Sequence, residues 1–389
     1  MKDKFAEILG GDNVSDKEND IFVYKQDGSG IEGSPKLIVW PSTTEDVARI
    51  VKLANIRNIP LVARGAGTSN AGCIQAQNAI VLDLGKMDKI VRVNLTERSI
   101  TVQPGVTAKQ INNLLSKYDL HFPVIPQVSS GVSTIGGIIS RNIFSCSPRF
   151  GRAGDWVMSL EVVDGTGKIF NPSKVPLFIG SEGLLGIITQ LTLKLIKPIP
   201  VLSGSWKSGM YDELVNMIPS LLADNDVFSI DFFDSYCSQL LGLGEKSHLW
   251  AQYTFLDKGD LKESNEINSV KQKISKIYML LKQNKYTLHT DPFVPKEHHL
   301  EFLRFCKKNE VPVYAHIASG IFHACARKEH PEMAYRIYKM AQKLNGFPSG
   351  ENGIGRVWKD YAPENWKNQI REHKKFYDPS GILNPGSVL

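Results

Sequence analysis

Two histidines seven positions apart stand in an apolar stretch that contains a turn signal. His316 and His323 flank the dipeptide Ser319-Gly320 within the sequence YAHIASGIFHA. If this dipeptide is a two-residue hairpin loop, His316 pairs directly with His323, and their Cβ atoms lie about 5 Å apart. Two imidazoles at that spacing could bind one metal ion. Two unrelated histidines, in the core or on the surface, are the alternative.

Three glycine-rich segments indicate that backbone approaches a ligand closely. The first follows a predicted strand and consists of Arg64, Gly65, Ala66, Gly67, Thr68 and Ser69. Such a loop can point successive N–H groups at a phosphate, and its guanidinium and hydroxyl groups add further donors. It fits neither the dinucleotide fingerprint nor the Walker loop. The other segments are VSSGVSTIGG at 128–137 and FIGSEGLLGIIT at 178–189. A tight turn is the alternative for one loop alone, but three together predict a long ligand.

The elements that must position these loops alternate between strands and helices. In the first half we expect strands at 36–40, 59–65, 79–85, 89–94, 99–105, 159–167 and 188–196, and helices at 42–58 and 108–118. This order predicts an α/β or α+β domain through about residue 198.

A change in composition after the KPIP sequence at 197–200 predicts a second domain. Here we expect helices at 212–223 and 264–283, and strands near 228–233, 249–255, 286–290 and 311–326. Two strand-helix-strand units on one sheet would form a ferredoxin-like layer. The tail from about Gly346 is again rich in glycine and proline, and we expect it to return to the first domain.

Composition excludes several classes of protein. The chain has 389 residues, of which 42% are hydrophobic and 22% charged, as is typical of globular proteins. The net charge of +6 is spread without long runs, so nucleic-acid binding is not indicated. Five cysteines without a C-x-x-C pair predict reduced thiols, a cytoplasmic protein and no iron-sulfur cluster on this chain. No secretory signal or membrane-spanning run is evident, so we expect a protein that is not integral to a membrane.

Together these segments resemble the FAD-linked oxidases of the vanillyl-alcohol oxidase superfamily, which have a PCMH-type FAD-binding domain. The matching motifs are RGAGTSNAG, PGV after Gln103, VSTIGG, FIGSEGLLGIIT and the ending DPSGILNPG at 378–386. Within the superfamily the chain is most similar to D-2-hydroxyacid dehydrogenases that act on glycolate, D-lactate or D-2-hydroxyglutarate. The resemblance implies an α+β fold: an FAD-binding domain of two α+β subdomains at 1–198, a ferredoxin-like cap at 199–345, and a C-terminal segment at 346–389 that packs on the FAD domain.

The resemblance also implies that the loops bind FAD, with its pyrophosphate on the Arg64 loop. No histidine stands in that loop, so we expect non-covalent FAD. The implied cofactor residues are Arg64, Gly65, Ala66, Gly67, Thr68, Ser69, Pro126, Ser129, Thr134, Gly136, Gly137, Asn142, Glu182, Gly183, Gly186, Ile188 and Asn384. Alternatively, some of these residues could have a structural role alone. Gly136 and Gly137 could allow close packing of strands, and Asn384-Pro385 could terminate a helix.

In the same family a divalent metal (Zn²⁺, Mn²⁺ or Fe²⁺) is bound by an H-x-G-D-G-N-x-H element and a G-E-H-G element. His316 and His323 match the first and Glu351 the second, so the resemblance implies these three metal ligands. Asn352 replaces the histidine that takes the substrate proton, and an amide cannot act as a base. His289 stands where a lysine is common, and Ser319 and Ile321 replace an Asp and an Asn. The candidate catalytic positions are therefore His316, His323, Glu351, Asn352 and His289.

The implied reaction is the oxidation of a small 2-hydroxyacid by hydride transfer to flavin N5. A metal-bound hydroxide, His289 or Tyr314 could replace the missing base, and the sequence leaves this choice open. Electrons would pass to dioxygen, a quinone or an iron-sulfur partner subunit, which could hold the chain at the inner face of a membrane. A homo-oligomer is compatible with the sequence. Two other interpretations are a flavin-carrying electron-transfer or structural subunit with a degenerate site, and a flavin enzyme of ether-lipid synthesis without net redox change.

Overall fold

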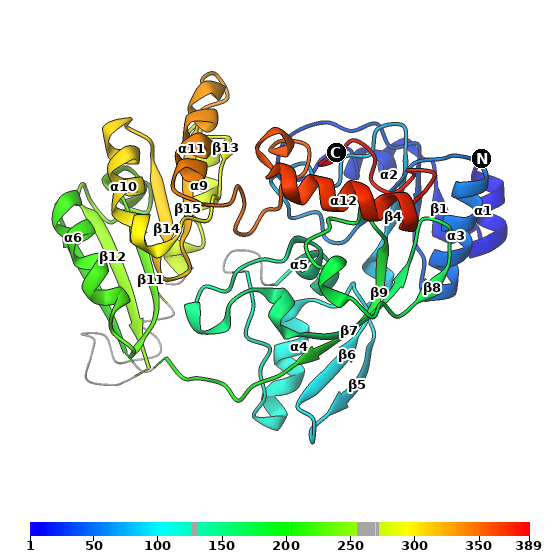
Figure 1. The fold of residues 1–389 in the computed structure, drawn as a ribbon, viewed down its shortest axis with the longest axis horizontal. Coiled ribbons are helices and arrows are strands. Elements are labelled where there is room, and N and C mark those ends of the chain that lie inside the picture. Colours follow the sequence, from blue (N-terminus) through cyan, green and yellow to red (C-terminus); the bar gives the residue numbers. More distant parts are fainter. Residues whose placement is uncertain (127–130, 202, 255–268, 270–271) are drawn as a thin grey trace. The chain divides into compact units, whose positions relative to one another are not determined.

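The computed structural model describes residues 1–126, 131–201, 203–254, 269 and 272–389. The chain forms two compact units. Unit 1 comprises 1–143, 152–198 and 352–389, and unit 2 comprises 144–151 and 199–351. Compared with the division expected from the sequence, unit 2 takes in 144–151 and extends to Glu351. Both ends of the chain belong to unit 1 (Figure 1).

The first sheet of unit 1 has four strands, in the order β1 (Val14–Ser15), β2 (Leu37–Val39), β4 (Ile80–Asp83) and β3 (Leu61–Arg64). Strands β2, β4 and β3 are parallel, and α3 (Thr44–Ile56) connects β2 to β3. A capping box between Thr43 and Asp46 begins this helix. Its apolar side chains recur at helical spacing and are buried. The strand that follows, β3, ends at Arg64, where the first glycine-rich loop begins.

The second sheet of unit 1 is antiparallel and has five strands. Its order is β5 (Ile90–Asn94), β6 (Ser99–Val102), β9 (Ile187–Lys194), β7 (Val157–Val163) and β8 (Ile169–Phe170). The other helices of unit 1 are α1 (Lys2–Leu9), α2 (Glu18–Val23), α4 (Ala108–Leu115), α5 (Ile135–Arg141) and α12 (Glu364–Tyr377). A sheet with parallel strands and a separate antiparallel sheet occur in one unit together with helices, which confirms the expected α+β class.

Unit 2 is built on one six-stranded antiparallel sheet. Its order is β10 (Ser203–Gly209), β12 (Ser247–Tyr253), β11 (Val227–Phe233), β14 (Val313–His316), β15 (Ile321–Ala326) and β13 (Leu288–His289). Helix α6 (Tyr211–Leu222) joins β10 to β11 on either side of β12, and α10 (His299–Lys308) joins β13 to β14 on either side of β15. The two strand-helix-strand units expected on one sheet are therefore present.

The two faces of this sheet have different neighbours. Side chains of β11, β12, β14 and β15 alternate between a core shared with α6, α10 and α11 (Pro331–Lys343) and a second cluster with α7 (Ser235–Leu240) and α9 (Ile277–Gln283). The helix expected at 264–283 lies partly outside the described residues. Within them, a turn at 275–276 interrupts it before α9.

The hairpin that carries the two histidines differs from the prediction. A 3₁₀ turn, η8 (Ile317–Ser319), followed by Gly320 with φ 72° makes the connection longer than two residues. His316 therefore pairs with Ile321, and His323 pairs with Tyr314. The predicted pairing was wrong by two positions. Because a shift of two preserves the side on which a strand residue points, both histidines still lie on the same face.

All five cysteines are free thiols. Among the described residues, no helix combines the length and the apolar character that crossing a bilayer requires.

Candidate functional site

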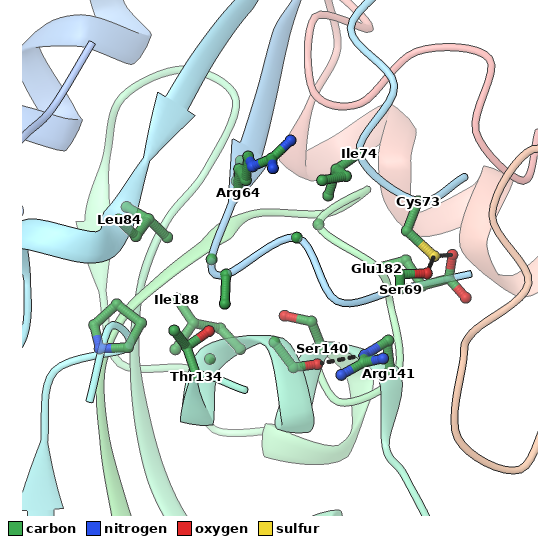
Figure 2. A pocket seen from close by; sticks show the side chains of 18 of the residues that line it. Arg64, Ser69, Cys73, Ile74, Leu84, Thr134, Ser140, Arg141, Glu182 and Ile188 are labelled. Carbon is green, nitrogen blue, oxygen red and sulfur yellow. Dashed lines mark hydrogen bonds between the residues drawn. The ribbon is translucent and has the colours of Figure 1, made fainter. Parts of the chain in front are cut away.

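A pocket in unit 1 gathers the three glycine-rich segments. Figure 2 shows its lining side chains, with Leu84 at one end and Cys73 beside Glu182 at the other. Most of the predicted cofactor residues line it, namely Arg64, Gly65, Ala66, Gly67, Thr68, Ser69, Thr134, Gly136, Gly137, Glu182, Gly183, Gly186 and Ile188. Segments from three parts of the sequence thus form one concave surface.

Four predicted cofactor residues do not line this pocket. Ser129 lies outside the described residues. Pro126 is described but is not part of the lining. Asn142 ends α5 with φ 52° and accepts a hydrogen bond from Gly154 N–H at 2.8 Å. Asn384 donates to the carbonyls of Cys73 (3.1 Å) and Glu182 (2.8 Å), so it ties two pocket loops together.

Close approach accounts for two glycines of the pocket, Gly65 and Gly136. A Cβ at Gly65 would lie 2.1 Å from Thr134 Oγ1, so the first loop meets the start of α5. A Cβ at Gly136 would lie 2.6 Å from that of Pro104, which supports the close-packing alternative for this residue. Gly67 has φ 71°, a conformation that other residues rarely adopt.

Glu182 holds the C-terminal segment against the pocket. Its buried carboxylate accepts hydrogen bonds from the N–H groups of Ile354 (2.6 Å) and Gly355 (2.9 Å). Burial raises the pKa of Glu182, while these two hydrogen bonds oppose the increase. A contact to the flavin was expected here. The carboxylate positions residues 354 and 355, and the contact to the flavin stays a prediction.

Sequence reasoning missed three polar residues of the pocket: Cys73, Ser140 and Arg141. The Arg141 Nε–H donates to the carbonyl of Gly137 within α5 at 3.1 Å. Burial and the Glu182 charge raise the pKa of the Cys73 thiol well above its ordinary value. Helical spacing after the VSTIGG motif could have indicated Ser140 and Arg141.

A second group of candidate site residues lies entirely in unit 2. His316, His323 and Glu351 each offer a ligand atom, and these atoms all lie within 4.8 Å of one another. The two imidazole rings have centroids 5.2 Å apart, and His323 Nε2 is 3.7 Å from Glu351 Oε2. Both histidines are buried and Glu351 is partly buried. This donor set is of the kind that binds Zn²⁺, Fe²⁺ or Mn²⁺.

Two aspartates hold this cluster. Asp231 Oδ1 lies 2.6 Å from His316 Nδ1, and both side chains are only 2% exposed. Burial would lower the pKa of His316, but the hydrogen bond and charge of Asp231 raise it above its ordinary value. Asp291 Oδ2 accepts hydrogen bonds from the N–H of Glu351 (2.7 Å) and from Ser349 Oγ (3.1 Å). Sequence reasoning assigned neither aspartate a role.

His323 is held differently. The ring of Tyr314 stacks on it, with centroids 4.3 Å apart and planes inclined by 12°. Burial, and then the nearby imidazoles of His316 and His289, keep the pKa of His323 well below its ordinary value. Neither of its ring nitrogens has a hydrogen-bond partner within the part of the chain that the structure describes.

The remaining candidate positions, Asn352 and His289, are not members of this donor set. Asn352 belongs to unit 1, where its Oδ1 accepts a hydrogen bond from Asn70 Nδ2 (2.9 Å) and its carbonyl accepts one from Ser69 Oγ (2.8 Å). His289 packs against Tyr278 with ring centroids 4.0 Å apart, and its Nδ1 lies 3.4 Å from Cys325 Sγ. Burial lowers the pKa of His289 to about 3.

Two protein-family models match this chain, one in its N-terminal half and one in its C-terminal half. A family model described as an FAD binding domain matches residues 35–173, and one described as the C-terminal domain of FAD linked oxidases matches residues 261–388. Together they cover more than half of the chain. The chain belongs to the FAD-linked oxidases. The family expected from the sequence motifs is thereby confirmed, and with it an FAD-linked oxidoreductase.

Several curated relatives of this FAD-linked oxidase are 2-hydroxyacid dehydrogenases. The D-lactate dehydrogenase of Archaeoglobus fulgidus is 25% identical, over 91% of this chain and 91% of the relative. The glycolate oxidase subunit GlcD of Bacillus subtilis is 24% identical, over 100% of this chain and 96% of the relative. The D-2-hydroxyglutarate dehydrogenase of Stutzerimonas stutzeri is 24% identical, over 92% of this chain and 91% of the relative.

Solved structures support the fold of this FAD-linked oxidase. The 4-ethylphenol oxidase from Gulosibacter chungangensis superimposes with a TM-score of 0.74 at 18% identity, over 99% of this chain and 96% of that chain. The p-cresol methylhydroxylase gives 0.69 at 17% identity, over 99% and 95%. At these identities the similarity concerns the fold alone.

Proposed function

We propose that this FAD-linked oxidase oxidises a small 2-hydroxyacid of the D-lactate or glycolate kind. FAD would bind non-covalently in the pocket of unit 1, and His316, His323 and Glu351 would hold a divalent metal. The observation that carries the proposal is a group of buried ring nitrogens in unit 2 that lie beside a carboxylate and have no hydrogen-bond partner among the described residues. The relatives named as 2-hydroxyacid dehydrogenases support the substrate class.

The residues present fit a metal ion. His316 Nε2 and both nitrogens of His323 are buried and have no hydrogen-bond partner among the described residues. Leaving one such polar atom buried and unsatisfied costs about 1–3 kcal/mol. Two imidazoles and one carboxylate also leave coordination positions for a substrate hydroxyl and carboxylate. When bound, FAD supplies a two-electron acceptor, and the metal supplies a Lewis acid that lowers the pKa of an alcohol.

The chain's own residues limit how the substrate proton leaves. Burial raises the pKa of Tyr314 well above its ordinary value, so this phenol stays protonated near pH 7 and is not a base there. His289 is neutral at that pH and retains a lone pair, although a pKa of about 3 makes it a weak base. Asn352 has no basic atom, and its side-chain oxygen accepts from Asn70.

A flavin-carrying electron-transfer subunit is the second candidate. The hydrogen bond between Asn352 and Asn70 favours this candidate. Asn352 stands at the position of the family's base, and here its side chain links two loops. One relative is itself named a subunit of glycolate oxidase. In either case the electrons would leave to an external acceptor, such as a quinone, dioxygen or an iron-sulfur partner.

The decisive experiment combines metal analysis with anaerobic flavin reduction. We expect the wild-type protein to contain one divalent metal per chain and to be bleached by D-lactate, glycolate or D-2-hydroxyglutarate. His316→Ala and His323→Ala should lose the metal and slow bleaching by at least about 100-fold, since the metal contributes several kcal/mol to the transition state. His330→Ala, at a side chain that is 67% exposed, is the matched control and should behave as wild type.

Two outcomes would contradict the proposal. Normal bleaching in a metal-free His316→Ala protein would remove the metal from the mechanism. A wild-type protein that binds both FAD and metal, but is bleached by none of these acids, would favour the electron-transfer subunit.

A further inference from the structure

We propose that Asp231 is a positioning residue for the metal site, because its carboxylate fixes the ring orientation and the tautomer of His316. In this role Asp231 keeps the proton on Nδ1 and leaves the lone pair on Nε2 available to a metal. The inference rests on the proposed function, since it concerns a ligand of the proposed metal.

Strand pairing places the two residues together. Asp231 on β11 and His316 on β14 are direct partners in the antiparallel register, so their side chains stand on the same face of the sheet. Oδ1 and Nδ1 are 2.6 Å apart, slightly less than the roughly 2.7–2.9 Å of charge-assisted N–H···O hydrogen bonds. Neither side chain is accessible enough for water to compete for this contact.

The hydrogen bond determines the tautomer. A carboxylate oxygen accepts this hydrogen bond, so the imidazole donates it from Nδ1. The neutral ring then has its lone pair on Nε2, which is buried without a partner among the described residues. Histidine ligands commonly donate their second nitrogen to a carboxylate in this way, which fixes the ring and raises its basicity.

His323 provides a contrast within the same site. Its orientation comes from stacking on Tyr314, and neither ring nitrogen is hydrogen-bonded in the described part of the chain. Of the two imidazoles, therefore, only His316 has its tautomer determined by a carboxylate before a metal arrives.

Asp234 offers a matched control on the same stretch of chain. It is also buried, but its carboxylate accepts from the backbone N–H groups of Cys237 (2.7 Å) and Val313 (2.9 Å). It therefore begins α7 and anchors β14 without touching an imidazole. Asp234→Asn tests what the loss of a buried carboxylate does to the fold, separately from any effect on His316.

The test measures Zn²⁺ affinity by competition with a chromophoric chelator, using the FAD-loaded protein. In Asp231→Asn the amide NH₂ can donate to Nδ1, which moves the ring proton to Nε2. We expect an affinity 10- to 100-fold weaker, the usual effect of removing such a partner. Asp231→Glu, which keeps a carboxylate, should recover part of the loss. Asp234→Asn should lower stability and leave the affinity of the folded protein unchanged.

A second measurement reads the tautomer directly. Nitrogen NMR of histidine-labelled, metal-free protein distinguishes protonated from unprotonated ring nitrogens, and His316→Gln assigns the signals. At a pH above the raised pKa of His316, we expect the wild-type ring to be protonated on Nδ1 alone, and Asp231→Asn to shift the proton to Nε2. This measurement needs no metal, and its wild-type result stands even if a variant fails to fold.

The outcomes separate this inference from the proposed function. A wild-type protein that binds no Zn²⁺ refutes the metal site, whereas the NMR result still decides the role of Asp231. If the wild type binds Zn²⁺ and Asp231→Asn binds it equally well, or if wild-type His316 carries its proton on Nε2, the inference on Asp231 is overturned.

Discussion

His299 shows how burial of one side chain links the stability of unit 2 to pH. The ring is 1% exposed, and its Nε2 lies 3.0 Å from the carbonyl of Val294. Burial lowers its pKa from about 6.5 to about 4. Between these two values the unfolded chain binds more protons than the folded one, so the free energy of unfolding decreases as the pH falls through this window.

We expect this histidine to cost about 1 kcal/mol of stability per pH unit between pH 6.5 and pH 4. Urea unfolding of the metal-free protein at pH 7, 6 and 5 measures the effect. The His299→Gln protein should lose less stability than the wild type over this range, while His330→Gln, on an exposed side chain, should follow the wild type. Equal pH slopes for His299→Gln and the wild type would contradict the assignment.

At the scale of elements, the hairpin between β14 and β15 sets the geometry of the histidine pair. Gly320 closes the turn with φ 72°, and a Cβ at this position would lie 2.5 Å from the carbonyl oxygen of Val294. Gly320→Ala should therefore destabilise unit 2 by more than about 1 kcal/mol and weaken metal binding, because both backbone strain and a steric clash must be relieved.

Gly242→Ala is the matched control for this prediction. Gly242 has nearly the same φ, 69°, but no atom lies within 4 Å of its added Cβ. The difference in free energy of unfolding between the two variants isolates the clash from the strain. Similar values for both would mean that the contact with Val294 relaxes at no cost.

At the scale of the whole molecule, the two candidate sites belong to different units. The cofactor pocket is lined only by residues of unit 1, whereas the three metal-ligand candidates belong to unit 2. A ligand stabilises the state that binds it, by about 2.7 kcal/mol at a concentration 100-fold above its Kd. Each ligand should therefore protect mainly its own unit.

Hydrogen exchange of the purified protein tests this separation. Removing the metal with a chelator should increase exchange in β11, β14 and β15 and leave β3 and α5 unchanged, and removing FAD should do the reverse. Chelation that increases exchange equally in both units would contradict it.

The sequence predicted the parts of this protein that depend on local pattern. The helix expected at 42–58 is present as α3 (Thr44–Ile56), and most of the loop residues identified from glycine spacing line one pocket. The two histidines were predicted on one face of a hairpin because side chains alternate along a strand, and this survived the error in register.

Partners distant in the sequence could not be predicted in this way. No local signal indicates that Asp231 pairs with His316, 85 residues later, or that Glu182 accepts from the N–H groups at 354 and 355. Those contacts form only when particular strands and loops become neighbours in the fold. Which strands become neighbours depends on how the assembled sheet buries its side chains. The amino-acid sequence by itself thus determined the family, the glycine-rich loops and the histidine pair. Only the tertiary structure decided which carboxylate holds which group, because strand order and burial are properties of the whole fold.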